Sequence, residues 1–159
     1  MTRKEQYNQL ILQIAGLIRD ETNLVGILAN VSAALRDTFP ERFFWVGFYL
    51  QENGNMLRLG PFQGSVACYV IPFGKGVCGK AWEEGRTLIV PDVEKFPGHI
   101  ACSSLSRSEI VVPMYDDSHT FRGVLDIDST QLNDFNEDDK EGLERIIELL
   151  MAETHDLFQ

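Results

Sequence analysis

The sequence has three cysteines, and their spacing limits the chemistry that they can support. Cys68, Cys78 and Cys102 lie ten and twenty-four residues apart, without a C-x-x-C or an H-x-x-x-H motif. Structural zinc requires ligands at short, clustered spacings, so we expect no metal site, although His99 could join the cysteines in space. Because His99 follows a Pro-Gly pair in a loop, we expect its side chain to be exposed.

A glycine-rich stretch, Gly74 to Ala81, fits the phosphate-loop pattern G-x-x-x-x-G-K up to its last position. A phosphate loop has Ser or Thr at that position to ligate magnesium, and Ala81 offers no oxygen. The helix expected to follow is short, ending near Gly85, and no parallel βαβ pattern surrounds it. The stretch therefore does not support nucleotide binding.

Redox chemistry, unlike metal binding, does not require the cysteines to be close in the sequence, because a nucleophilic thiolate and a resolving thiol need only meet in the folded protein. Cys102 lies in a polar segment, HIACSSLSRSEI, with Arg107 nearby, where positive charge could stabilise an exposed thiolate. Cys68 lies in an expected strand, and Cys78 lies beside glycines at an expected strand-to-helix turn. A buried cysteine such as Cys68 is more often a small hydrophobe. On the residues alone, all three cysteines stay candidates.

Two carboxylates share one face of the expected strand FRGVLDIDS. The apolar residues of this strand can face the core, which puts Asp126 and Asp128 together on the opposite face. Glu109 opens the neighbouring strand and could add a third acid. Like charges about 4 Å apart repel by roughly 4 kcal/mol at an effective dielectric constant near 20, so a sheltered pair favours a cation or a shared proton. The ammonium group of a ligand would supply that cation.

The expected strand FFWVGFYL alternates in the same way. Trp45, Gly47 and Tyr49 share one face, so that two aromatic rings flank a glycine gap, while Phe44 falls on the opposite face. Two aromatic residues in a second core layer would be the simpler interpretation of this strand by itself. Together with the acids and the thiols, however, the aromatic walls describe a pocket for a small zwitterion or an amine with an apolar tail.

The spacing of the apolar side chains predicts the helices and strands on which these residues lie. Helical spacing predicts three helices, over Tyr7–Ile18, Leu24–Leu35 and, after an N-cap at Asn136, Leu143–Leu157. A period of two predicts strands at 43–50, 56–62, 67–73, 87–92, 109–115 and 121–129. Turn-forming residues between them favour antiparallel hairpins. The predicted fold class is α+β, with the terminal helices on one face of a central antiparallel sheet.

Composition limits the class of protein and its partners. The 159 residues, of which 44% are hydrophobic, suit one domain that spans 1–159. A formal net charge of -10 disfavours nucleic acid and anionic membranes as partners. The first ten residues lack the apolar region of a signal peptide, so we expect a cytoplasmic protein. In a reducing compartment the cysteines would be thiols, and any disulfide would be transient.

Several stretches of the sequence are similar to one enzyme family. The stretches WVGFYL, GPFQG, ACYVIPFGKGVCG, VPDVEKFPGHIACSSLSRSEIVVPM and GVLDIDS resemble the free methionine-(R)-sulfoxide reductases. The members of this family are single-domain enzymes of the GAF fold. The resemblance implies a GAF-like sheet with a loop-covered ligand pocket on the face away from the terminal helices.

The resemblance also implies a role for each candidate residue. Cys102 matches the catalytic cysteine, Cys68 the principal resolving cysteine and Cys78 an auxiliary third cysteine. The acids Glu109, Asp126 and Asp128 match the acidic residues of the substrate site. The aromatic residues Trp45 and Tyr49 match its walls.

The implied reaction is the reduction of free L-methionine-(R)-sulfoxide. The Cys102 thiolate would attack the sulfoxide sulfur while one of the three carboxyl groups donates a proton, and Cys102 would become a sulfenic acid. Cys68 would then form a disulfide with Cys102, and a thioredoxin-type dithiol would reduce it. No cofactor is implied, and the sequence leaves the oligomeric state open, a homodimer included.

Two other functions stay open on the residues. A GAF-type module could bind a small ligand as a sensor, since one fold serves many functions. A thiol peroxidase-like protein would use Cys102 against peroxide, but nearby carboxylates raise a thiol pKa and disfavour that chemistry. Cysteine-dependent turnover of the sulfoxide would separate both alternatives from the reductase.

Overall fold

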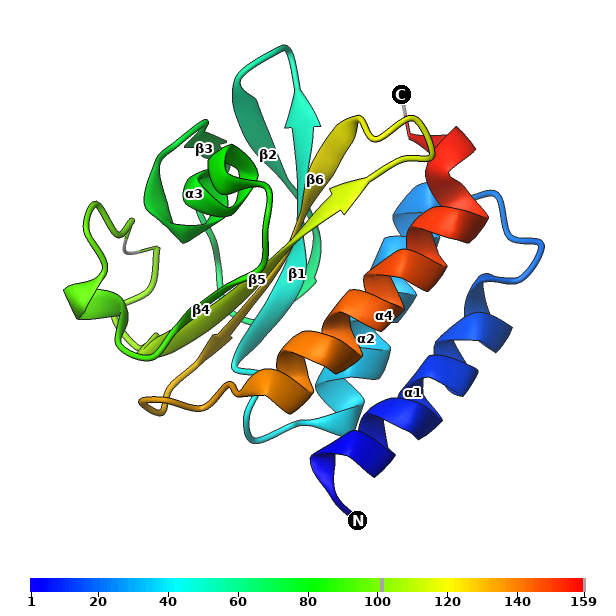
Figure 1. Cartoon of the computed structure of the whole chain (residues 1–159), viewed down its shortest axis with the longest axis horizontal. Helices are drawn as coiled ribbons and strands as arrows, with labels where there is room; N and C mark the ends of the chain where they lie inside the picture. The colour runs from blue at the N-terminus through cyan, green and yellow to red at the C-terminus, as the bar shows by residue number, and fades with distance from the viewer. Residues whose placement is uncertain (101, 159) are drawn as a thin grey trace.

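The computed structural model describes residues 1–100 and 102–158 and contains one six-stranded antiparallel sheet. The strand order is β3-β2-β1-β6-β5-β4, so that β1 and β6 lie at the centre (Figure 1). The strands are β1 Trp45–Glu52, β2 Met56–Gln63, β3 Val70–Pro72, β4 Leu88–Val90, β5 Ser108–Tyr115 and β6 Phe121–Ser129. The two longer hairpins, β1–β2 and β5–β6, turn where the sequence predicts them.

Helices cover the two faces of the sheet unequally (Figure 1). The long helices α1 (Arg3–Ile18), α2 (Leu24–Thr38) and α4 (Glu137–Thr154) form a layer on one face, while α3 (Gly76–Glu84) lies on the other. Short 3₁₀ turns follow at Val93–Lys95 and His155–Leu157. This arrangement confirms the predicted α+β class. Among the residues described, no helix is both long and apolar enough to cross a membrane.

The helical layer is fixed by a buried polar cluster as well as by apolar packing. Asn136 and Asp139 form a capping box at the start of α4. Asp139 is fully buried and also accepts hydrogen bonds from the Tyr7 hydroxyl of α1 and from the guanidinium groups of Arg3 and Arg42. A buried carboxylate needs such partners, because an unpaired one would cost several kcal/mol. The cluster therefore locks α1 and α4 in register.

Alternation along the central strands divides the core into two layers. Val46, Phe48, Leu125 and Ile127 point into the main core beneath the long helices. Trp45, Tyr49, Val111 and Val124 point to the opposite face, where they pack with α3 in a second cluster. The period of two therefore predicts correctly which side each of these residues takes.

Two predictions about the strands are wrong. The strand expected at 67–73 is only three residues long, and Cys68 lies before it in an irregular segment. The backbone carbonyls of Ser65 and Cys68 accept hydrogen bonds from the side chains of Trp45 and Tyr49, at 3.0 Å each, which holds this segment over the sheet. Phe44 precedes β1 and packs with the second cluster, so strand alternation does not apply to it.

Candidate active site

The register of β1, β6 and β5 gathers the predicted acids on the face away from the long helices. Asp128 of β6 lies opposite Glu109 of β5 on one side and opposite Trp45 of β1 on the other. Asp126 lies opposite Gly47, two residues further along the same face. Directly paired residues in an antiparallel sheet point to the same side. The acids therefore form the floor of a pocket, and Glu109 and Asp126 are buried in it.

Burial raises the pKa of all three acids, and the charges of neighbouring carboxylates raise the pKa of Glu109 and Asp128 further. Burial, followed by the charges of Asp126 and Asp128, raises the pKa of Glu109 well above its ordinary value. Burial and the charge of Asp126 do the same for the pKa of Asp128. Burial raises the pKa of Asp126 less, since hydrogen bonds from Glu109 and Cys78 stabilise its charged form. The cluster therefore keeps its protons to higher pH than isolated carboxyl groups do, and Asp126 is the member whose pKa is raised less strongly.

One oxygen of this floor lacks a partner. Asp126 Oδ1 is buried and receives no hydrogen bond within the part of the chain that the structure describes. A buried carboxylate oxygen without a donor is costly. A ligand that carries an ammonium group would supply both the donor and the positive charge.

Trp45 and Tyr49 form an aromatic wall beside the acids. Their rings stack with centroids 5.9 Å apart, and Phe62 stacks on the outer side of Trp45 at 5.1 Å. Gly47 lies between the two in β1, and a Cβ atom there would overlap with Phe62, so only glycine fits. Burial, with the nearby acids, raises the pKa of Tyr49, which keeps its hydroxyl protonated as the donor to the Cys68 carbonyl.

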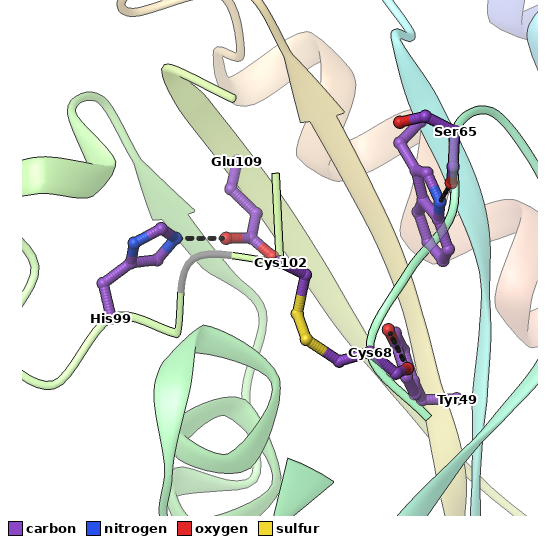
Figure 2. The surroundings of a disulfide bond; sticks show 7 residues. Tyr49, Ser65, Cys68, His99, Cys102 and Glu109 are labelled. Carbon is purple, nitrogen blue, oxygen red and sulfur yellow. Dashed lines mark hydrogen bonds and ion pairs between the residues drawn. A yellow bond between two sulfur atoms is a disulfide. The ribbon is translucent and has the colours of Figure 1, made fainter. Parts of the chain in front are cut away.

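Cys68 and Cys102 form a disulfide at this wall, as Figure 2 shows. Their Cα atoms lie 5.5 Å apart, although 34 positions separate them in the sequence. Cys102 lines the pocket, and both cysteines are half-buried. These are the two cysteines for which the resemblance implies a catalytic and a resolving role.

Cys78 is a free thiol that does not take part in the disulfide. It is buried on α3, and its sulfur lies within 4.8 Å of carboxylate oxygens of Glu109 and Asp126. Three such ligands could hold a metal ion, but metal ligands must be deprotonated. Burial and the neighbouring acids instead raise the pKa of the Cys78 thiol, which makes it a donor to Asp126. The expected absence of a metal stays a prediction.

The pocket also contains residues that sequence analysis does not place there. The cavity at the centre of the pocket is small, about 40 Å³. His99, expected to be exposed, lines it with a side chain only 16% exposed, and its Nε2 lies 3.9 Å from Oε1 of Glu109 (Figure 2). Burial lowers the pKa of His99. Phe44 lines the pocket as well, although alternation over the expected strand 43–50 puts it on the opposite face. It precedes β1, and His99 lies in an irregular segment, so alternation indicates neither position.

Comparisons with known proteins agree with this geometry. The GAF domain family matches residues 21–152. GAF domain-containing protein A of Dictyostelium discoideum is 56% identical over 149 residues, which cover 94% of this chain and 92% of that protein. The free methionine-R-sulfoxide reductase of Saccharomyces cerevisiae is 43% identical over 155 residues, covering 94% and 86% of the two chains.

A solved structure gives the same result in three dimensions. The X-ray structure of free methionine-R-sulfoxide reductase from Neisseria meningitidis, in complex with its substrate, superposes with a TM-score of 0.93 at 46% identity. The match covers 98% of this chain and 92% of that one. The chain therefore belongs to the GAF-domain family of free methionine-R-sulfoxide reductases.

Proposed function

We propose that the protein reduces free L-methionine-(R)-sulfoxide to methionine by thiol chemistry. The observation that carries the proposal is the disulfide between Cys68 and Cys102 at a pocket with an acidic floor and an aromatic wall. Relatives named for this activity cover almost the whole chain, at 42% and 43% identity. A ligand-binding module without catalysis would need neither the paired cysteines nor the buried acids with raised pKa beside them.

The acids and the aromatic residues divide substrate recognition between them. Asp126, with its unpaired Oδ1, and Asp128 bind the substrate ammonium. Trp45 and Tyr49 enclose the S-methyl end. A methionine sulfoxide within a polypeptide has no ammonium group, and burying Asp126 against it would leave the carboxylate unpaired. The site therefore selects the free amino acid.

Reduction of the sulfoxide transfers its oxygen to Cys102. The Cys102 thiolate attacks the sulfoxide sulfur to form a sulfur–sulfur bond, and a protonated carboxyl group donates a proton to the oxygen. The resulting hydroxyl group then passes from the substrate sulfur to Sγ of Cys102, and the sulfur–sulfur bond breaks with its electron pair left on methionine. We assign this donor to Glu109, because its carboxyl group contacts both other acids and faces His99. Methionine leaves with two electrons more than the sulfoxide had, and Cys102 is oxidised to a sulfenic acid.

Cys68 completes the oxidative half of the cycle. Its thiolate attacks the Cys102 sulfenic acid, a sulfur–sulfur bond forms, and water leaves. The structure contains the bond that this step makes. A thioredoxin-type dithiol of a reducing, cytoplasmic compartment then returns both cysteines to thiols. Because all the residues named belong to one chain, the mechanism applies equally to a monomer and a homodimer, and it uses no resident cofactor.

Separate assays of the two sulfoxide epimers test the proposal. We expect the wild-type protein to release methionine from the R epimer only, with dithiothreitol as reductant. Cys102→Ser should abolish release, while Cys68→Ser, reduced beforehand and assayed after the dithiothreitol is removed, should release about one methionine per chain before it stops. Turnover of neither epimer by folded, reduced protein would contradict the proposal and favour a ligand sensor. Reduction of hydrogen peroxide in preference to the sulfoxide would favour a thiol peroxidase.

A further inference from the structure

The two segments joined by the disulfide differ in charge from the rest of the chain. Residues 57–82 and 95–108 contain no Asp or Glu, so all 24 acidic residues lie elsewhere in a protein with a formal net charge of -10. The same two segments carry five basic residues: Arg58, Lys75, Lys80, Lys95 and Arg107. Neither segment is strongly basic by itself, but the disulfide brings them together.

Three of these basic side chains are free to meet a partner. Lys75, Lys95 and Arg107 are exposed, whereas Lys80 pairs with Glu83 at 2.9 Å. Arg58 is exposed too, but Leu57 and Leu59 beside it pack on the pocket face, so alternation turns Arg58 to the opposite face of the sheet. The Arg107 carbonyl accepts a hydrogen bond from Val93, which brings the Lys95 turn close to the Cys102 segment.

Large apolar side chains are exposed next to both cysteines. Tyr69, which follows Cys68, is 77% exposed, and Leu105, three residues after Cys102, is 59% exposed. At 3.8 Å per residue, both lie within about 12 Å of the disulfide. Single exposed apolar residues are common on protein surfaces. Here they flank the one bond that must be reached from outside in every catalytic cycle.

We propose that this surface, formed by Tyr69, Leu105, Lys75, Lys95 and Arg107 and called here the disulfide surface, docks an acidic protein dithiol. The inference rests on the proposed function, because that function requires the disulfide to be reduced once per turnover. An apolar centre with charges around it is the usual anatomy of a transient protein interface. The positive charges would steer an acidic partner, although the whole protein repels it.

The docked partner reduces the bond by two exchanges. One partner thiolate attacks a sulfur of the Cys68–Cys102 bond, a mixed disulfide forms, and the released cysteine thiolate takes up a proton. The second partner thiol, after losing its proton, attacks the mixed disulfide and releases the other cysteine, which is protonated in turn. Two electrons pass from the partner to this protein, and the partner is left as a disulfide.

Rates of disulfide reduction measured with a protein and with a small dithiol test this docking. Oxidised protein is mixed with reduced thioredoxin, as an acidic protein dithiol, or with dithiothreitol, and free thiols are counted after acid quenching and alkylation. Tyr69→Ser/Leu105→Ser and Lys75→Glu/Lys95→Glu should each lower the rate with thioredoxin about 10-fold or more. The rate with dithiothreitol should stay within about twofold of the wild type. Salt should slow the wild-type reaction but not that of the charge variant, in which it screens repulsion from the partner.

Matched substitutions far from the disulfide surface serve as controls. Leu12→Ser and Lys4→Glu change exposed residues of α1 and should leave both rates unchanged. Equal thioredoxin rates for wild type and both double variants would overturn the docking proposal, and so would a wild type that thioredoxin does not reduce. A dimer that Tyr69→Ser/Leu105→Ser dissociates in sedimentation would assign the surface to a second copy instead. Methionine release with dithiothreitol is assayed separately, so failure of the proposed function is distinguished from failure of docking.

Discussion

Asp126 is the residue on which we expect substrate binding to depend most directly. Asp126 is buried, and it lies opposite Gly47, which separates Trp45 from Tyr49 along β1. Its Oδ1 has no partner among the residues described. Asp126→Asn keeps the shape but removes the charge that pairs with the ammonium. Losing a charged hydrogen bond of about 1.5–3 kcal/mol predicts a fall of roughly 10- to 100-fold in kcat/KM, mostly through KM. Steady-state kinetics with the R epimer and dithiothreitol measure this.

An acid outside the pocket provides the comparison for Asp126. Asp37 is exposed on α2, on the opposite face of the sheet, so Asp37→Asn makes the same chemical change without touching the site. We expect wild-type kinetics from Asp37→Asn and an unchanged circular dichroism spectrum from both variants. Wild-type KM in Asp126→Asn would remove Asp126 from the substrate site.

Glu109 links the chemistry of the site to the stability of the protein. Its pKa in the folded state is raised above the ordinary value, so the folded protein binds more protons than the unfolded chain between those two pKa values. The stability therefore falls as the pH rises above about 4.5, and little is lost below it. Glu109→Gln removes this penalty at high pH but also removes the proposed proton donor.

Thermal unfolding at two pH values checks this linkage. At pH 8 we expect Glu109→Gln to have a higher Tm than the wild type, by roughly 3–5 °C for each pKa unit that folding adds. At pH 4 the two proteins should unfold at nearly the same temperature. Glu52→Gln, an exposed change at the end of β1, should show no such difference between the two pH values. A lower Tm of Glu109→Gln at pH 8 would show that the carboxyl group stabilises the fold.

At the scale of elements, the contact between α1 and α4 depends on one glycine. A Cβ atom at Gly142 of α4 would overlap with the ring of Tyr7 on α1. Gly142→Ala should therefore separate the helices and weaken the hydrogen bond from Tyr7 to Asp139, at a cost of about 1–3 kcal/mol in the free energy of unfolding.

Gly16 lies on the exposed side of α1, and a Cβ atom there would have no neighbour within 4 Å. Gly16→Ala should stabilise the protein by about 0.5–1 kcal/mol. Urea denaturation compares the two variants, and a loss in both would contradict the assignment.

The elements whose residues alternate regularly could be predicted from the sequence, and the rest of the site could not. Alternation in β6 is enough to put Asp126 and Asp128 on one face, and the short connections favour the antiparallel pairing that brings Glu109 beside them. Cys68 and His99 lie in irregular segments, and the bonds that fix such segments are long-range. The Cys68 carbonyl is held by Tyr49, 19 residues away, a contact that no local pattern encodes.

At the scale of the whole molecule, the sheet separates stability from chemistry. The long helices lie on one face and α3 lies on the other (Figure 1). The polar cluster of Asp139 joins the long helices, whereas the pocket and the disulfide are on the face of α3. The two faces share the central strands, so that the residues of β6 alternate between the main core and the acid floor. Changes in the redox state of the cysteines therefore affect the packing of the pocket face. The long helices stabilise the strands from the opposite face.

The redox state should set the stability of the whole protein. The disulfide joins residues 34 positions apart and so restricts the unfolded chain, which corresponds to a stabilisation of up to about 4 kcal/mol. Reduction should lower the free energy of unfolding in urea by a large part of this value. It should also speed hydrogen exchange in residues 64–69, 96–100 and 102–107, since the disulfide is the covalent bond that joins these segments. Cys78→Ala should show the same difference between oxidised and reduced protein, because Cys78 is not in the bond, whereas Cys102→Ser should show none. Equal stability of the two redox states would mean that contacts such as the Tyr49 hydrogen bond hold the pocket face without the disulfide.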